Sequence, residues 1–156
     1  MNSNVLALAG GVGGAKLASG LCEVLDVSQI SIVVNTADDT TVHGLYVCPD
    51  VDTVMYSIAK IANPCTGWGI NCDTFDTLDM LAKYGADTWF NIGDRDMATH
   101  IIRSELLRNG YSLSDATTNM CKALGIDYTI VPMSDHPIRT VVETTEGDLS
   151  FQEYFV

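Results

Sequence analysis

The chain has 156 residues, enough for one domain, and 47% of them are apolar while 18% are charged, a composition that excludes extended disorder. Its formal net charge of −12 repels nucleic acids and anionic membranes, so we expect neither as a partner. No apolar run reaches the roughly 18 residues of a membrane span, and the first residues lack a basic secretion signal, so we expect a cytoplasmic protein.

The chain opens with a predicted βαβ unit. A strand from about Asn4 to Ala9 leads through a glycine-rich turn into a helix that starts near Ala15, and a second strand follows over Ile30–Val34. The helix is expected to bury one apolar face, formed by Leu17, Leu21, Val24 and Leu25. Short β-branched strands that alternate with helices predict an α/β fold with a mostly parallel sheet.

The glycine-rich turn is the first candidate site. Glycines let backbone N–H groups approach an anion closely, and the helix dipole favours negative charge at the same point. We therefore predict that the turn binds a nucleotide phosphate; a tight turn without a ligand is the alternative, because the pattern matches no standard phosphate-binding motif. The candidate nucleotide-binding residues here are Gly10, Gly11, Gly13, Gly14 and Lys16.

Two acidic segments come next. Asp38 and Asp39 follow the second strand, at the sheet edge where open α/β folds bind ligands. Because an acidic protein that binds phosphate needs a cation at the site, we predict that this pair binds Mg²⁺, with a solvated loop as the alternative. Asp50 is expected to cap a helix that Asn63 and Pro64 end, whereas Asp52 is not needed for the cap and is the better functional candidate.

The middle of the chain predicts a helix over about Phe75–Tyr84, a strand over Thr88–Ile92 and a helix over about Met97–Arg108. A charged turn, Gly93-Asp94-Arg95-Asp96, lies between the last two. Arg95 can bind phosphate or carboxylate with two hydrogen bonds, so we place Asp94 and Arg95 in the active site. A structural ion pair is the alternative, and His100 alone is more typical of a packing or surface histidine.

The last third predicts a helix that begins with a capping box, Ser112 and Asp115, and ends at Gly125. A strand over Tyr128–Val131 follows, and then a loop whose exposed hydroxyl and carboxylate are also ligand candidates: Met133, Ser134 and Asp135. Ile138–Thr144 and Leu149–Val156 predict a hairpin around Glu146-Gly147-Asp148. The apolar strand at the end would need cover by a partner or by further chain, and we expect a homodimer.

Five cysteines at irregular spacing, without a Cys-x-x-Cys pair, predict neither disulfides nor a zinc site. Cys22 and Cys121 are expected in helix cores. We expect residues 1–156 to form a single Rossmann-like α/β domain, with helices on both faces of the sheet and a C-terminal β-hairpin.

Seven motifs in this order resemble the 2-phospho-L-lactate transferases of deazaflavin coenzyme biosynthesis. They are Gly10-Gly11-x-Gly13-Gly14-x-Lys16, Val34-Asn35-Thr36-Ala37-Asp38-Asp39, Pro49-Asp50-x-Asp52-Thr53, Thr66-Gly67-Trp68-Gly69, Gly93-Asp94-Arg95-Asp96-x-Ala98-Thr99-His100, Pro132-Met133-Ser134-Asp135-x-Pro137 and Phe151-Gln152-Glu153-Tyr154-Phe155. The resemblance implies an Mg²⁺-dependent enzyme that moves a phospholactyl or phosphoenolpyruvyl group from a GDP-activated donor to the deazaflavin precursor Fo and releases GMP.

The resemblance also implies residue roles. Asp52 and Arg95 would hold the deazaflavin, the glycine turn and the Met133–Asp135 loop would hold the nucleotide, and Asp52 or Asp94 would orient or deprotonate the acceptor hydroxyl. Val12 stands where many members carry threonine, and members are about twice as long, so the chain resembles their N-terminal portion. A sugar-nucleotide-binding regulatory protein of a related family, or a nicotinamide-dependent dehydrogenase, are the alternatives.

Overall fold

The computed structural model describes residues 4–145 and 147–155. Its main sheet contains three parallel strands in the order β1-β2-β5, with bounds Val5–Ala9, Ile30–Val34 and Thr129–Pro132. The β-branched residues of β2 place it at the centre, where every second side chain is buried. The α/β fold with a parallel sheet is therefore confirmed.

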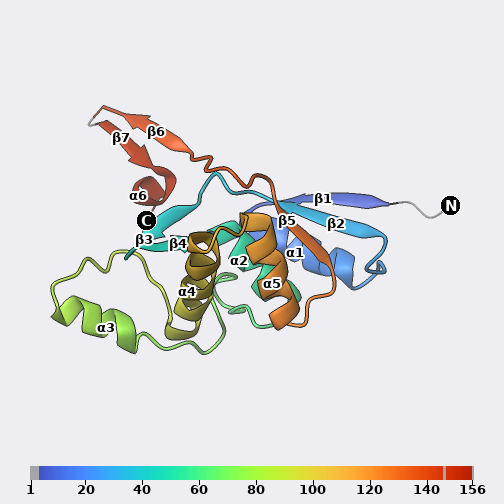
Figure 1. Ribbon diagram of the computed structural model, residues 1–156, viewed down its shortest axis with the longest axis horizontal. Helices are drawn as coiled ribbons and strands as arrows, with labels where there is room; N and C mark the ends of the chain where they lie inside the picture. The colour runs from blue at the N-terminus through green and yellow to red at the C-terminus, as the bar shows by residue number, and fades with distance from the viewer. Residues whose placement is uncertain (1–3, 146, 156) are drawn as a thin grey trace.

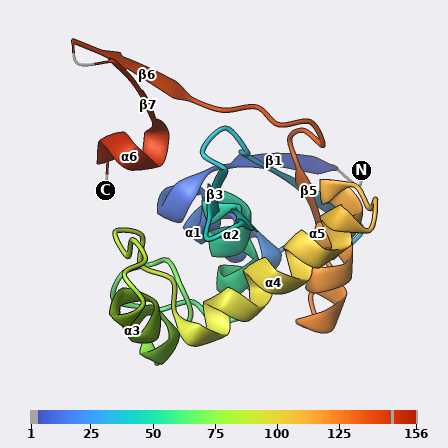
Figure 2. The ribbon, with the colours of Figure 1, turned by 60° about the vertical axis from the view of Figure 1, so that its left-hand side comes forward.

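Five longer helices surround this sheet and its edge: α1 (Gly11–Cys22), α2 (Pro49–Ile58), α3 (Asp76–Lys83), α4 (Asp94–Arg108) and α5 (Leu113–Ala123). Figures 1 and 2 show α1, α2 and α5 on one face of the sheet, with α4 farther below. On the other face of β1, Leu6 and Leu8 are 65% and 73% exposed. None of the helices within the described residues is long and apolar enough to cross a membrane.

Helix α1 packs on the sheet through small residues. Ala15 and Ala18 are fully buried, whereas Leu17 and Val24, which we expected in the core, are largely exposed. The helix also begins at Gly11 and not near Ala15. Leu21 and Leu25, the other two residues of the predicted face, are partly buried and pack against the core, so half of that face is confirmed.

The predicted strand over Thr88–Ile92 is wrong. This segment is a loop in which Trp89 is 40% exposed and Ile92 alone is fully buried, against Val42 and Val47. These two valines belong to a hairpin that we did not predict, β3 (Thr40–Val42) with β4 (Leu45–Val47).

The turn of this hairpin, His43-Gly44, has positive φ at both residues. That is the geometry of a two-residue hairpin turn, and His43-Gly44 between the short runs Thr40–Val42 and Leu45–Val47 was the signal for it. Helix α4 begins at Asp94, three residues earlier than expected, so the charged turn forms its first turn.

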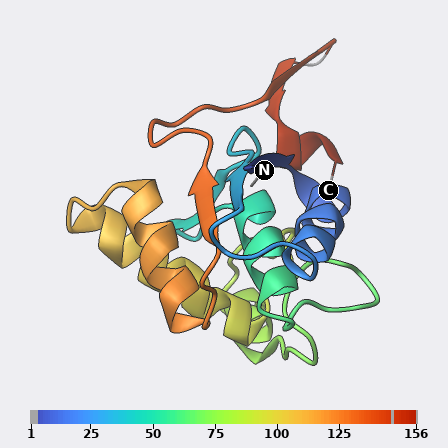
Figure 3. The same ribbon diagram turned by 90° about the vertical axis from the view of Figure 1, so that its right-hand side faces the viewer.

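The C-terminal hairpin is confirmed, as β6 (Val141–Thr144) and β7 (Gly147–Ser150), and it projects away from the helices (Figures 1 and 3). The predicted second strand, Leu149–Val156, is wrong beyond Ser150, because Phe151–Phe155 forms helix α6. Ser150 and Glu153 explain the helix: the Ser150 amide donates to the Glu153 carboxylate and the Glu153 amide donates to the Ser150 hydroxyl, which is a capping box. Our predictions for Glu146 and Val156 lie outside the described residues.

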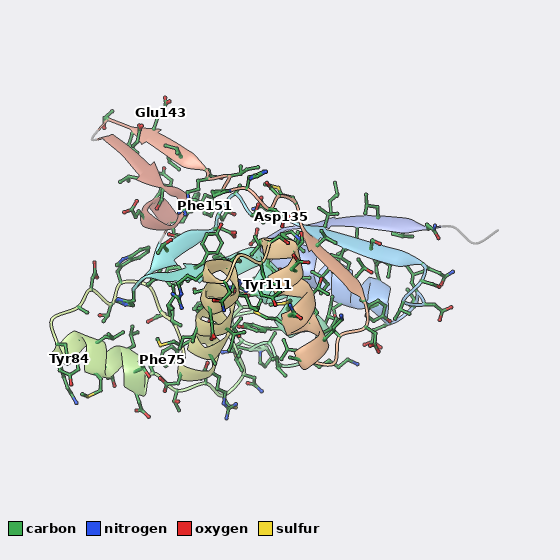
Figure 4. The ribbon with its side chains drawn as sticks, viewed as in Figure 1. Phe75, Tyr84, Tyr111, Asp135, Glu143 and Phe151 are labelled. Atoms are coloured by element: carbon green, nitrogen blue, oxygen red, sulfur yellow. The ribbon has the colours of Figure 1, made fainter. Side chains whose placement is uncertain are left out.

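Other local predictions agree with the structure. Helix α5 begins at the capping box of Ser112 and Asp115, and the hydroxyl of Ser112 accepts the Asp115 amide at 3.0 Å. Cys121 is buried in α5 and Cys22 is half-buried in α1. Tyr84, beyond the last turn of α3, points away from the body of the molecule and is 81% exposed (Figure 4).

Candidate functional site

A cavity of about 340 Å³ opens between the start of α1, the helices α2 and α4, and two loops around Trp68 and Phe90. Its apolar lining consists mainly of Val12, Tyr56, Trp68 and Phe90. Its polar lining includes three carboxylates and an imidazole: Asp50, Asp52, Asp96 and His100. An aromatic cavity with a few convergent polar groups is the usual form of a small-molecule site.

The glycine turn lies at one end of this cavity. Only Gly11 of its predicted nucleotide-binding residues lines the cavity; Gly13 and Lys16 are exposed. Gly14 has a packing role, because a Cβ there would lie 2.9 Å from Ala9 Cα. A Cβ added to Gly10 would lie 3.2 Å from Asp50 Oδ2, so the Asp50 carboxylate lies against the glycine turn.

Asp50 is not the helix cap that we expected. Helix α2 begins at Pro49 with Cys48 as the N-cap, and Asp50 lies in its first turn, buried beside the end of β2. The side-chain amide of Asn35 donates through Nδ2 to Asp50 Oδ2 at 2.9 Å and to Asp38 Oδ2 at 3.0 Å. Burial first, and the Asp50 charge second, raise the pKa of Asp38 above its usual value.

Asp39 has different surroundings from Asp38. The Cys48 thiol lies 3.2 Å from Asp39 Oδ2 and donates to it, and burial raises the pKa of Asp39 to about 7. Within residues 4–145 and 147–155 no group of three or more His, Cys, Asp or Glu side chains is placed to hold a metal ion. Magnesium binding by Asp38 and Asp39 stays a prediction.

Asp52 lines the cavity and forms a buried ion pair with Arg103 of α4. Asp52 Oδ2 accepts from Arg103 Nη1 at 3.1 Å, and Asp52 Oδ1 accepts from Arg103 Nη2. Burial alone would lower the pKa of Arg103, but its neighbours together, led by the Asp52 carboxylate, outweigh burial and raise it. Sequence reasoning missed Arg103 as the partner of Asp52, although it shares a helix face with Asp96 and His100.

His100 is 2% exposed and lies between two carboxylates, which makes it a cavity residue and not a surface one. Its Nδ1 lies 3.7 Å from Asp52 Oδ2 and its Nε2 lies 3.4 Å from Asp96 Oδ1. Asp96 also accepts from the Tyr56 hydroxyl at 2.6 Å, and that hydroxyl hydrogen-bonds to Thr99 Oγ1 at 2.7 Å. Burial favours a higher pKa for Asp96, but contacts with His100 and Tyr56 outweigh it and lower the pKa.

Asp94 and Arg95 do not line the cavity. The Asp94 carboxylate accepts from the Thr74 hydroxyl at 2.6 Å and from the amides of Asp76 and Thr77 at the start of α3. These hydrogen bonds, led by the one from Thr74, lower the pKa of Asp94 to about 2. Arg95 is exposed, and its Nη1 donates to the Asn71 carbonyl at 3.4 Å.

The Met133–Asp135 loop lies at the carboxyl end of β5, on the other side of β2 from the glycine turn. The Met133 amide donates to the Val34 carbonyl at 2.8 Å, and Asp135 accepts from the Ser114 amide at the start of α5 (Figure 4). Ser134 hydrogen-bonds within the loop to His136. The structure therefore places this loop on the predicted ligand edge of the sheet but outside the cavity, and its nucleotide contacts stay a prediction.

Comparison with known proteins assigns the chain a family. A family model described as 2-phospho-L-lactate transferase CofD matches residues 5–156. The chain is 44% identical over 152 residues to the 2-phospho-L-lactate transferase of Methanosarcina acetivorans, which covers 97% of this chain and 50% of that protein. It is 42% identical over 157 residues to the phosphoenolpyruvate transferase of Streptomyces griseus, with 97% and 49% covered. The chain thus spans about half the length of the curated relatives it matches.

Proposed function

The chain belongs to the 2-phospho-L-lactate transferase CofD family, and from that premise we propose that it carries the acceptor side and part of the nucleotide side of a transferase site. In the proposed reaction a 2-phospholactyl or phosphoenolpyruvyl group passes from a GDP-activated donor to the hydroxyl of Fo, and GMP leaves. Relatives are named for each of the two groups, so either three-carbon acid fits the proposal. The observation that carries it is the aromatic, acid-walled cavity between α2 and α4.

The side chains that line the cavity suit the binding of Fo, the proposed acceptor. Trp68, Phe90 and Tyr56 offer apolar and aromatic surface against which a flat deazaflavin ring can pack. Asp52 and Asp96 offer acceptor oxygens for the hydroxyl groups of its side chain. Because both oxygens of Asp52 accept from Arg103, we propose that Asp52 orients the attacking hydroxyl and does not take its proton.

The nucleotide would lie along the carboxyl edge of the sheet, where Gly10, Asn35 and Met133 follow the three strands in one row. The carboxylates of Asp38 and Asp50 lie at this edge. They would repel a phosphate there unless a cation lay between the carboxylates and the phosphate. Mg²⁺ commonly takes one or two carboxylates together with phosphate oxygens. The pair Asp38 and Asp50, which share the Asn35 amide, fits that donor set, whereas Asp39 faces Cys48 and does not.

We propose therefore that Asp38 and Asp50 hold Mg²⁺, which when bound would neutralise charge on the phosphates. The Asn35 amide keeps the two carboxylates at this edge, and the backbone of the glycine turn lies beside Asp50. Arg95 stays a predicted contact of the acceptor, outside the cavity lining.

A binding experiment tests the acceptor assignment. The folded chain is titrated with Fo and with GDP, each with Mg²⁺, by isothermal titration calorimetry. We expect Fo to bind, and Asp52→Asn to weaken that binding, while Asp79→Asn on the exposed face of α3 leaves it unchanged. Absence of binding to both ligands in a folded sample would contradict the proposal.

The homodimer expected from the sequence is also a proposal. It is supported by exposed aromatic residues on α6, where Tyr154 and Phe155 are 52% and 65% exposed. Sedimentation at several protein concentrations tests it, and a monomer at every concentration would contradict it.

A further inference from the structure

His100 carries a ring nitrogen to which none of the described residues gives a hydrogen bond. The side chain is 2% exposed and lines the cavity, and its Nε2 has no hydrogen-bond partner among the described residues. Asp96 Oδ1 is 3.4 Å away, an ion-pair contact that falls short of a well-formed hydrogen bond, and it already accepts from the Tyr56 hydroxyl. A buried polar atom without a partner is costly, so its place at a cavity wall points to a ligand.

Arg103 decides which of the two ring nitrogens carries the proton. Its Nη1 lies 3.3 Å from His100 Nδ1. A guanidinium has only donors, so a hydrogen bond between them requires Nδ1 to accept. Neutral His100 then carries its proton on Nε2, at the cavity wall.

Arg103 is itself fixed. It is fully buried and donates to both oxygens of Asp52, and the two N–H groups of its Nη1 are shared among Asp52 Oδ2, the Tyr46 carbonyl at 3.3 Å and His100 Nδ1 at 3.3 Å. The guanidinium therefore cannot turn away from His100 without breaking a buried ion pair. The arrangement Asp52, Arg103 and His100 holds the imidazole in one tautomer.

We propose that His100 orients the ligand in the cavity by donating a hydrogen bond from Nε2, with Arg103 as the positioning residue that fixes this tautomer. The neighbouring carboxylates Asp50, Asp52 and Asp96 are acceptors, so they select donor groups of a ligand. His100 selects the complement, a carbonyl oxygen or an unprotonated ring nitrogen. The ligand class is thus a planar, uncharged ring system with an acceptor atom among its donors, and its identity as Fo rests on the proposed function.

The tautomer is measured directly by NMR on the chain labelled with ¹⁵N in its histidine rings. The chain has three histidines, and the exposed His43 and His136 serve as internal references. We expect His100 at pH 7 to show a protonated Nε2 and an unprotonated Nδ1, in signals that His100→Gln removes. An Nδ1-protonated ring or an imidazolium would overturn the proposal, and this measurement does not depend on any ligand.

Two substitutions then test the hydrogen bond to the ligand. Glutamine places an amide N–H near the position of Nε2, whereas asparagine reaches only the position of Nδ1. We expect His100→Gln to bind Fo within about threefold of the parent chain, and His100→Asn to bind about tenfold more weakly, with thermal unfolding used to confirm that both variants fold. Equal affinities for the two variants would overturn the orienting role. If the parent chain does not bind Fo, the orienting role falls with the proposed function, while the NMR result still decides the tautomer.

Discussion

Asp52 and Arg103 form a bidentate ion pair that joins the first turn of α2 to the third turn of α4 beneath the cavity. The side chains are 6% and 0% exposed, so neither charge has water as an alternative partner. Such a pair is strongly destabilising when only one member is removed, because the other charge stays buried and unpaired.

We therefore predict that Arg103→Met lowers the free energy of unfolding by about 3–5 kcal/mol. Arg108→Met, in the exposed last turn of the same helix, should change it by no more than about 0.5 kcal/mol. Urea unfolding followed by circular dichroism measures both. The double variant Asp52→Leu with Arg103→Met should recover most of the loss, because it leaves no uncompensated charge.

The pairing of Asp52 with Arg103 could not be predicted from the sequence. The functional role predicted for Asp52 rests on its place in the first turn of a helix, which is local information. Its partner lies 51 positions away, and the packing of α4 against β4 brings the two together. For the same reason His100, expected to be an ordinary packing histidine, proved to line the cavity.

Asp94 and Asp73 cap each other's helices. Asp94 accepts the amides at the start of α3, and Asp73 accepts those of Arg95 and Asp96 at the start of α4. We predict that Asp94→Ala accelerates hydrogen exchange of the α3 amides and leaves Fo affinity within about twofold, because Asp94 lies outside the cavity. Asp79→Ala, an exposed substitution in α3 itself, is the control. A large loss of affinity with α3 intact would instead support the catalytic role that the sequence suggested.

The same carboxylate predicts a pH dependence. Because hydrogen bonds lower the pKa of Asp94 from 3.8 to about 2 in the folded chain, its contribution to stability is complete above pH 4 and is lost as the pH falls through 2. The amide chemical shift of Thr77 should titrate with a midpoint near pH 2, and this titration should disappear in Asp94→Ala. A midpoint near 4 would show that the cap is not formed.

Gly13 and Gly14 are predicted to respond oppositely to alanine. A Cβ on Gly14 would meet the backbone of Ala9 at 2.9 Å and 3.1 Å, whereas one on Gly13 meets nothing within 4 Å. Gly14→Ala should cost about 1–3 kcal/mol of stability through overpacking, and Gly13→Ala should gain about 0.5–1 kcal/mol through helix propensity. Thermal unfolding separates the two. Similar effects of both substitutions would show that α1 can move away from β1.

The two predicted strands that are wrong failed for different reasons. Thr88–Ile92 has the composition of a strand, but it pairs with none of β1, β2 and β5 in the described sheet. Phe151–Phe155 alternates enough to suggest a strand, yet the capping box of Ser150 and Glu153 starts a helix there. The parallel strands and α5 were predictable because their own residues determine them, whereas pairing between segments was not.

The two tryptophans, Trp68 and Trp89, are about equally exposed, but only Trp68 lines the cavity, so they form a matched pair for a binding test. Trp68 is 46% exposed and lines the cavity, whereas Trp89 is 40% exposed and packs edge-to-face on Phe90 without lining it. The loop of Trp68 is held by its own contacts: Thr66 donates to the Trp68 carbonyl at 2.6 Å, and a Cβ on Gly67 would lie 2.5 Å from Val12. Removing the indole should therefore leave the loop in place.

We expect Trp68→Ala to weaken Fo binding about tenfold, since an aromatic wall of the cavity is lost, and Trp68→Phe to restore most of it. Trp89→Ala should stay within about twofold of the parent chain. Calorimetric titration of the three variants with Fo measures the difference. If Trp89→Ala loses as much as Trp68→Ala, the loops around the cavity move as one unit and ligand packing on Trp68 is not the cause; if neither loses affinity, the ring of the ligand binds elsewhere.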